Sequence, residues 1–202
     1  MSDFFKSIER IKTWAAVNAP DALANLQLPA SSSRLALLRE LLPAGVPEEL
    51  FEWFGLHDGD GNMSWNSMLP DGMQFLNADW LIEMYSYGVA SPDVSEESLD
   101  ANIATIRGPV RPYWFGPLRV PFAHRNGEVL WVIDLDPGPG GDVGQVIYDD
   151  AECVHLEVLA SSIGELLAQY ASELEQGDFF VSEEGCICSR QGRIWPNYAL
   201  LN

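Results

Sequence analysis

The chain has 202 residues, 47% of them hydrophobic, and a formal net charge of −19 at pH 7. This length and apolar content suffice for one core-bearing domain with extensions and exclude a disordered polypeptide. The negative charge disfavours nucleic acid and anionic lipid as partners and favours basic proteins, although an acidic surface also serves solubility alone.

The cations are confined to three parts of the chain. Residues 40–106 and 126–189 contain no Lys or Arg, but thirteen and fourteen acidic residues respectively. This distribution predicts a broad negative field that attracts a basic partner. No apolar run reaches the roughly 20 residues that span a bilayer. The amino terminus does not have the pattern of a signal peptide, so we expect a cytoplasmic protein.

Three helices are predicted before residue 55. Apolar residues at helical spacing predict an amphipathic helix over residues 3–17, followed by a connector over residues 18–30. One of the serines at 31–33 is placed to cap a second helix over residues 34–42. Pro47 suits a first helical position, and the two glutamates after it favour the positive end of a third helix to about residue 54.

Residues 57–62 (HDGDGN) form a loop by composition. His57 beside Asp58 has the residue types of a general base and its orienting carboxylate. No Ser or Cys nucleophile in a recognisable turn accompanies them, so a turn or a partner-facing loop is the preferred interpretation. A short strand over residues 65–69 follows, and then a helix from an Asn77 or Asp79 cap to about residue 87.

The middle of the chain changes character twice. Residues 88–104 are acidic and poor in apolar side chains, which indicates an exposed loop. Residues 107–119 interleave Arg with aromatic residues, a pattern that can bind a nucleic-acid strand by stacking. Because the flanking acidic residues repel phosphate, a buried aromatic edge of the fold is favoured instead.

Three segments rich in Val, Ile, Leu and Trp predict consecutive antiparallel strands over residues 128–135, 144–148 and 154–159. The pair Asn126-Gly127 before the first of them suits a tight turn with positive φ. Alternation divides the first strand into two faces, one of them core and the other partly covered. The first face carries Val129, Trp131, Ile133 and Leu135, and the second carries Leu130, Val132 and Asp134.

A last long helix is predicted to about residue 176, with Ser161 or Ser162 as its cap and Glu165 at the capping-box position. The tail beyond it carries aromatic and aliphatic residues that suggest docking, with Trp195 the largest of them. We therefore expect the extension to pack on the same domain.

Neither a metal nor a cofactor is predicted. Aspartates at alternate positions in residues 134–142 have the spacing of a calcium loop, but Pro139 replaces the sharp-turn glycine and Gln145 replaces the closing glutamate. A rigid turn is preferred. Cys186 and Cys188 could supply two of the four ligands of a zinc site, but no matching Cys or His pair follows them. Phosphate loops and dinucleotide fingerprints are also absent from the sequence.

Seven motifs together resemble the SUKH superfamily, over roughly residues 33–176. In chain order they are residues 42–50 (LPAGVPEEL), 56–59 (LHDG), 68–72 (MLPDG), 120–123 (VPFA), 133–137 (IDLDP), 144–147 (GQVI) and 160–163 (ASSI). That superfamily includes yeast cell-wall assembly regulators of the Smi/Knr type and many bacterial immunity proteins. The resemblance implies an α+β fold, in which helices pack a mainly antiparallel sheet, and a protein-binding role without catalysis.

The expected organisation is an N-terminal helix and connector (1–30), a SUKH-like domain (31–177) and a C-terminal extension (178–202). Our first functional hypothesis is an immunity protein that binds a toxin effector with a basic surface. The alternative is a regulatory scaffold of the cell-wall-regulator type without a toxin, and an enzyme using His57 and Asp58 ranks third.

The predicted partner contacts are acidic or amide residues in three loops, and each of them also has the bland interpretation of a solvated loop residue. They are Asp58, Asp60 and Asn62 in the first loop, Asp93, Glu96 and Glu97 in the exposed loop, and Asp149, Asp150 and Glu152 in a hairpin turn.

Overall fold

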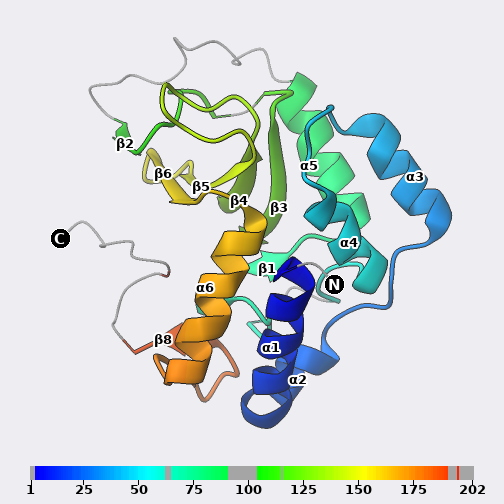
Figure 1. Ribbon diagram of the computed structural model, residues 1–202, viewed down its shortest axis with the longest axis vertical. Coiled ribbons are helices and arrows are strands. Elements are labelled where there is room, and N and C mark those ends of the chain that lie inside the picture. The colour runs from blue at the N-terminus through cyan, green and yellow to red at the C-terminus, as the bar shows by residue number, and fades with distance from the viewer. Residues whose placement is uncertain (1–2, 62–64, 91–103, 115, 191–194, 196–202) are drawn as a thin grey trace.

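The computed structural model describes residues 3–61, 65–90, 104–114, 116–190 and 195, which form an α+β fold (Figure 1). The helices are α1 (Asp3–Asn18), α2 (Pro20–Ala24), α3 (Ser32–Leu41), α4 (Glu48–Leu56), α5 (Ala78–Ala90) and α6 (Ile163–Gln176), with a 3-10 turn η1 (Pro70–Gly72). The strands are β1 (Gln74–Phe75), β2 (Thr105–Arg107), β3 (Arg119–Arg125), β4 (Val129–Asp134), β5 (Gln145–Asp150), β6 (His155–Ala160), β7 (Phe179–Val181) and β8 (Ile187–Ser189).

The main sheet has the strand order β1-β3-β4-β5-β6-β2. Every neighbouring pair is antiparallel except β2 with β6, which confirms a mainly antiparallel sheet. The three predicted central strands are confirmed as β4, β5 and β6. Asn126 and Gly127 have φ values of 55° and 78°, so the turn between β3 and β4 uses the conformation that this pair adopts most readily.

The two faces of β4 enter different apolar clusters, as its alternation predicts. Trp131 and Ile133 belong to the main core, which also takes residues from α1, α4 and α6. Leu130 and Val132 belong to a smaller cluster, together with Ile147 on β5. The second face is therefore buried by fewer residues than the first.

Serine caps fix the starts of two helices where the sequence predicts them. Ser31 accepts a hydrogen bond from the Arg34 N–H at the start of α3. At α6 the Ser162 hydroxyl accepts from the Glu165 N–H at 3.1 Å, while the Glu165 carboxylate reaches back to the Ser161 N–H at 2.8 Å. Helix α6 then lies beside α1, where Arg10 pairs with Glu175 at 2.7 Å (Figure 1).

One local prediction is wrong, and a second segment has more structure than its prediction specified. Residues 65–69 form no strand, because Met68 and Leu69 are inserted into the core and the Met68 carbonyl accepts from the Tyr170 hydroxyl at 3.0 Å. The Tyr170 hydroxyl thus takes the place of the backbone N–H that a neighbouring strand would have donated to Met68. The connector over residues 18–30 contains the short helix α2, which Pro20 starts at a position where its missing N–H costs nothing.

The loop over residues 134–142 is tied to the fold through its own polar groups. Asp134 is buried and accepts from the Gln145 amide at 2.9 Å, and Asp136 pairs with Arg111 at 3.1 Å. The described parts of the chain contain no cluster of three or more His, Cys, Asp or Glu side chains arranged to hold a metal. These aspartates bind protein donors instead.

The segment before β3 forms a partly buried aromatic edge, as predicted, although Phe115 lies outside the described residues. Tyr113 is buried, and the Arg119 guanidinium lies 3.9 Å from the centre of its ring. Beyond α6, Trp195 is buried with Trp131 and Tyr170 at ring distances of 5.8 and 5.1 Å. Within the described ranges, no helix combines the length and the apolar character needed to cross a bilayer.

Candidate protein-binding surface

Helix α5 carries apolar side chains on two of its faces. Leu81 and Tyr85 are buried in the main core. Trp80, Met84 and Tyr87 follow one another at spacings of four and three residues and form a second stripe. In this stripe Trp80 is 38% exposed and Tyr87 is 71% exposed. A helix that docks on the core with one face thus presents an aromatic stripe to solvent with the other.

A groove of about 640 Å³ runs between this stripe and the turns that follow β3 and β5. Leu130 and Asp149 line it from the sheet. Three exposed glutamates also line it, namely Glu83, Glu128 and Glu152. The groove therefore combines apolar walls with negative charge, and its volume is typical of ligand sites, about 300–1,000 Å³.

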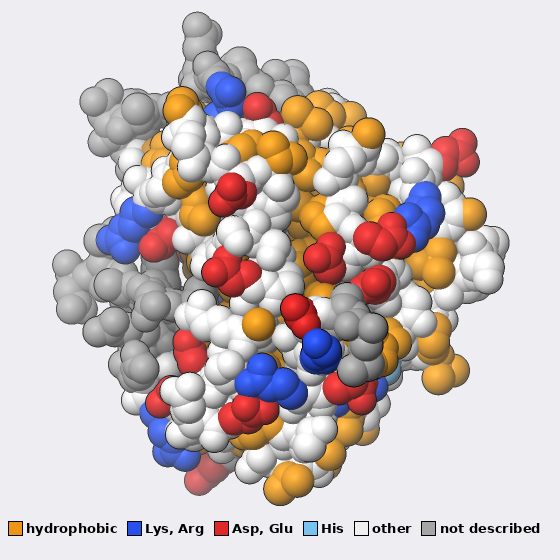
Figure 2. Space-filling model, viewed as in Figure 1, with side chains coloured by type: hydrophobic (Ala, Val, Ile, Leu, Met, Phe, Trp, Pro, Cys, Tyr) orange, Lys and Arg blue, Asp and Glu red, His pale blue; other side chains and the backbone are white. Residues whose placement is uncertain are grey.

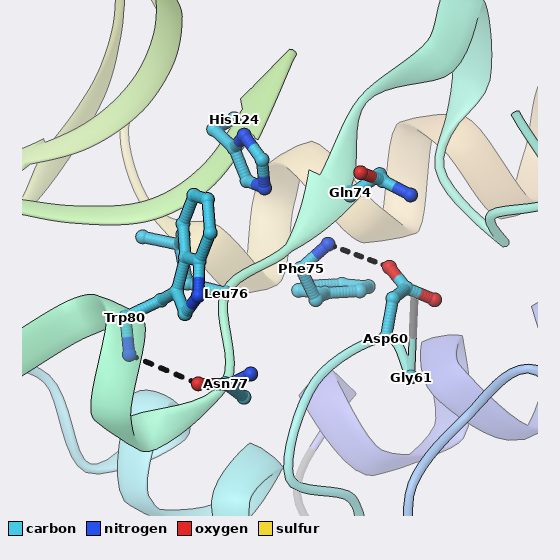
Figure 3. A pocket seen from close by; sticks show the side chains of 8 residues that line it. All are labelled: Asp60, Gly61, Gln74, Phe75, Leu76, Asn77, Trp80 and His124. Carbon is cyan, nitrogen blue, oxygen red and sulfur yellow. Dashed lines mark hydrogen bonds between the residues drawn. The ribbon is translucent and has the colours of Figure 1, made fainter. Parts of the chain in front are cut away.

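A smaller hollow of about 100 Å³ lies on the other side of Trp80 (Figure 3). The Trp80 indole stacks on the His124 imidazole with ring centres 5.2 Å apart, and burial lowers the His124 pKa. Asn77 caps α5 by accepting from the Trp80 N–H at 2.9 Å. This cap places Trp80 at the start of the helix, where it borders both the hollow and the groove.

Asp60 is a buried carboxyl group in the small hollow. Its Oδ2 accepts from the Phe75 N–H at 2.7 Å and from the Ser67 hydroxyl at 3.1 Å, whereas its Oδ1 has no partner among the described residues (Figure 3). Burial raises its pKa to about 7, against these two hydrogen bonds. Through the Phe75 N–H, Asp60 connects the first loop to β1, so its hydrogen bonds have a structural role.

Asp149 is the buried carboxyl group of the groove. It is 1% exposed, and no group in the described parts of the chain donates a hydrogen bond to its Oδ2. Burial raises its pKa to about 7, while the positive charge of Arg119 acts in the opposite direction. Unlike Asp60, this side chain has no evident role in holding the fold together.

Acidic side chains are dispersed over the face drawn in Figure 2, and basic side chains adjoin several of them. In the part of the chain that the structure describes, Arg10 forms an ion pair with Glu175, and Arg39 forms one with Glu48. The negative charge on this face is thus spread out and does not mark one docking patch by itself.

Comparison with known proteins identifies the family. Residues 29–169 match the SMI1 / KNR4 family (SUKH-1). The chain belongs to this family. The groove lies wholly within the matched region, because its lining residues fall between residues 80 and 152.

The SMI1 / KNR4 relatives are fungal regulators. The chain is 23% identical to the cell wall assembly regulator SMI1 of Saccharomyces cerevisiae, over 91% of this chain and 43% of that protein. It is 24% identical to the glucan synthesis regulatory protein of Neurospora crassa, over 88% and 40% of the two chains. It is also 24% identical to the cell wall biosynthesis/cell cycle regulator smi1 of Schizosaccharomyces pombe, over 89% and 38%. The chain therefore spans about two fifths of these relatives.

In this SMI1 / KNR4 family member, the predicted contact residues separate into distinct environments. Asp149 and Asp150 do not lie in the hairpin turn, because β5 extends through both and they are buried. Asp150 accepts from the Tyr148 hydroxyl and the Cys153 N–H. Glu152 is in the turn, exposed and beside the groove. Asn62, Asp93, Glu96 and Glu97 lie outside the described residues.

The first loop does not bring His57 and Asp58 together as an acid–base pair. The Asp58 carboxylate accepts from the Ala78 N–H at 2.7 Å and so caps α5. The His57 Nδ1 lies 3.0 Å from the Gln27 carbonyl, and burial lowers the His57 pKa. Both side chains therefore serve the local structure, and the three relatives named above are described as regulators.

Sequence reasoning missed the aromatic stripe and His124 as parts of a site. The sequence predicts one helix through Trp80, Met84 and Tyr85, and that prediction did not divide these residues between a buried and an exposed face. The apolar residues at positions 80, 84 and 87 form a second stripe that could have indicated this surface. A helix with two apolar stripes requires a second packing partner in addition to the core of its own domain.

Proposed function

We propose that this chain is a non-catalytic protein-binding module of the cell-wall-regulator type, and that its partner docks on the groove beside α5. The observation that carries the proposal is the exposure of Trp80 and Tyr87, on either side of the half-buried Met84, beside a groove inside the family-matched region. The names of the fungal relatives support a regulatory role over a toxin-binding one.

The physical mechanism has two stages. The net charge of −19 steers a basic partner toward the chain and sets the association rate more than the final affinity. Trp80 and Tyr87 then supply large, rigid contact areas, the residue types that dominate binding energy at protein interfaces. Among the predicted contacts, Glu152 is exposed at the groove and Asp149 lines its floor.

A pull-down from a lysate of the source organism, with the purified chain as bait, tests the proposal. Three baits are compared: wild type, the double variant Trp80→Ala/Tyr87→Ala and the control Phe180→Ala, which changes an exposed aromatic residue on β7. We expect proteins of wall synthesis or its regulation on the wild type and the control, and their loss from the double variant. Equal capture by all three baits would remove the groove from the proposal.

The same pull-down distinguishes the immunity hypothesis from the regulatory one. Recovery of a toxic protein encoded by the neighbouring gene, inactive in the complex, would replace the regulatory role by toxin neutralisation. The three relatives named above carry no such description, which is why the regulatory role is the one proposed.

A further inference from the structure

Asp149 lies in surroundings that do not stabilise a negative charge. In the sheet its direct neighbours are Leu130 on β4 and Leu156 on β6, both buried. It also lines, together with Met84, a small hollow of about 10 Å³ next to the groove. A buried carboxylate without donors is costly and uncommon in a folded protein. Such a group is informative when it faces an accessible groove.

The charged groups around Asp149 do not neutralise it. Arg119 on β3 is the cation that acts on it, but its guanidinium donates to the Tyr113 and Arg111 carbonyls. The carboxylate that lies within ion-pair distance of Arg119, at 4.0 Å, is that of Asp134. Among the described residues, the other charged groups that act on Asp149 or line the groove are negative. They are Asp150 on the same strand, Glu83 on α5, and Glu128 and Glu152 at the two turns.

We propose that the groove receives a lysine side chain of the partner protein, whose ammonium group pairs with the Asp149 carboxylate while its methylene groups lie along Trp80 and Met84. The inference rests on the proposed function, because it names the partner chemistry at the same surface. Lysine side chains bury an apolar stem and carry a compact charge at the tip, which fits apolar walls with one carboxylate at the floor. The three exposed glutamates of the groove would attract further basic residues of the partner on either side of that lysine.

Lysine fits this groove better than arginine. A guanidinium group carries five N–H donors in a rigid plane and needs several acceptors, whereas one buried carboxyl group serves a compact ammonium group. Arginine recognition would call for a cluster of acceptors at the floor, and Asp149 is the one acidic residue among those lining the groove that is buried.

Binding of the lysine is linked to the protonation of Asp149. In the unoccupied groove the carboxyl group retains a proton up to about neutral pH, since burial raises its pKa to about 7. A nearby cation favours the ionised form, so the pKa falls when lysine binds and a proton is released. Affinity for lysine therefore increases as pH rises from about 6 to about 8.

The test uses the full chain and a blocked synthetic peptide with one lysine among leucine and alanine residues. Titration calorimetry at pH 8 and about 0.3 M salt, where surface charges are screened, gives the dissociation constant. We expect acetylation of the lysine, and the variant Asp149→Asn, each to weaken binding at least about tenfold, the equivalent of one pKa unit. Glu152→Gln, which removes the same charge at an exposed position, should weaken binding less than about threefold.

Three outcomes would overturn the lysine site: unchanged binding in Asp149→Asn, equal binding of the acetylated peptide, or tighter binding of a matched peptide in which arginine replaces the lysine. A measurement on the wild-type protein tests the same pairing without depending on whether the Asp149→Asn variant folds. The Asp149 carboxyl carbon is followed by NMR during a pH titration, with and without the lysine peptide. A lower pKa with the peptide supports the pairing, and an unchanged pKa contradicts it.

The pull-down separates this inference from the proposed function. If Asp149→Asn captures the partner and Trp80→Ala/Tyr87→Ala does not, the groove binds a protein without the lysine contact. If the lysine peptide binds through Asp149 but the double variant still captures the partner, the partner docks elsewhere and the pairing of its lysine with Asp149 is contradicted.

Discussion

The two faces of the main sheet differ in how completely they are covered. On one face, Trp131 packs into a core built with α1, α4 and α6. On the other, Leu130 belongs to a small cluster, and incomplete cover by α5 leaves the groove. The same strand supplies both residues in succession. Alternation in β4 thus supplies a closed core on one face and the open groove on the other.

The largest expected effect is the loss of Trp131. Trp131→Ala removes a fully buried side chain from a closed core, so we expect the free energy of unfolding to fall by about 3–5 kcal/mol. Leu130→Ala on the open face should cost nearer 2 kcal/mol, because solvent from the groove can reach the space that it leaves. Urea unfolding of both variants measures the difference, and equal losses would contradict the distinction between the faces.

The two buried aspartates sharpen the same comparison. Asp60→Ala leaves the Phe75 N–H without its acceptor, so we expect a loss of about 1–3 kcal/mol in the free energy of unfolding. Asp149→Asn breaks no hydrogen bond to its Oδ2 and should be neutral or stabilising. Urea unfolding near pH 5.5, where both wild-type carboxyl groups are largely protonated, is the measurement. A loss in Asp149→Asn equal to that in Asp60→Ala would make Asp149 a structural residue.

The same two groups contribute to the pH dependence of stability. Because burial raises the folded-state pKa of Asp60 and Asp149 from 3.8 to about 7, the folded state binds more protons than the unfolded state between these values. Their contribution is fully present below about pH 4 and is lost as pH rises through about 7. Each group adds a slope of up to about 1.4 kcal/mol per pH unit.

Asp149→Asn should remove one of these two slopes. Unfolding by urea at intervals from about pH 4 to about pH 8 measures it, and Glu152→Gln is the matched control because this carboxylate is exposed. An unaltered slope in Asp149→Asn would mean that Asp149 is ionised in the folded state at all these pH values.

The sequence was sufficient for the central strands because the alternation in residues 129–135 and the Asn126-Gly127 turn are local signals. It failed at residues 65–69, where the partner of the Met68 carbonyl is Tyr170, a residue 102 positions away. The candidate site was found in part. Asp149 and Glu152 were named for their charge, but the burial of Asp149 depends on β5 continuing two residues past its predicted end at residue 148.

A small effect on stability is expected for Trp80, although it lies at the centre of the candidate surface. Trp80→Ala removes a side chain that is 38% exposed, so we expect the free energy of unfolding to change by no more than about 1 kcal/mol. The same change uncovers the imidazole of His124, on which the indole stacks. Since burial lowers the His124 pKa, renewed contact with water should raise it toward its ordinary value.

An NMR titration of the His124 ring protons checks this shift, and Tyr87→Ala is the control because Tyr87 lines the groove but not the hollow that contains His124. A loss of stability in Trp80→Ala comparable to that in Trp131→Ala would place Trp80 in the core and remove the second stripe of α5. A raised His124 pKa with unchanged stability would instead mark Trp80 as a residue kept at the surface, where an aromatic side chain contributes to binding and little to folding.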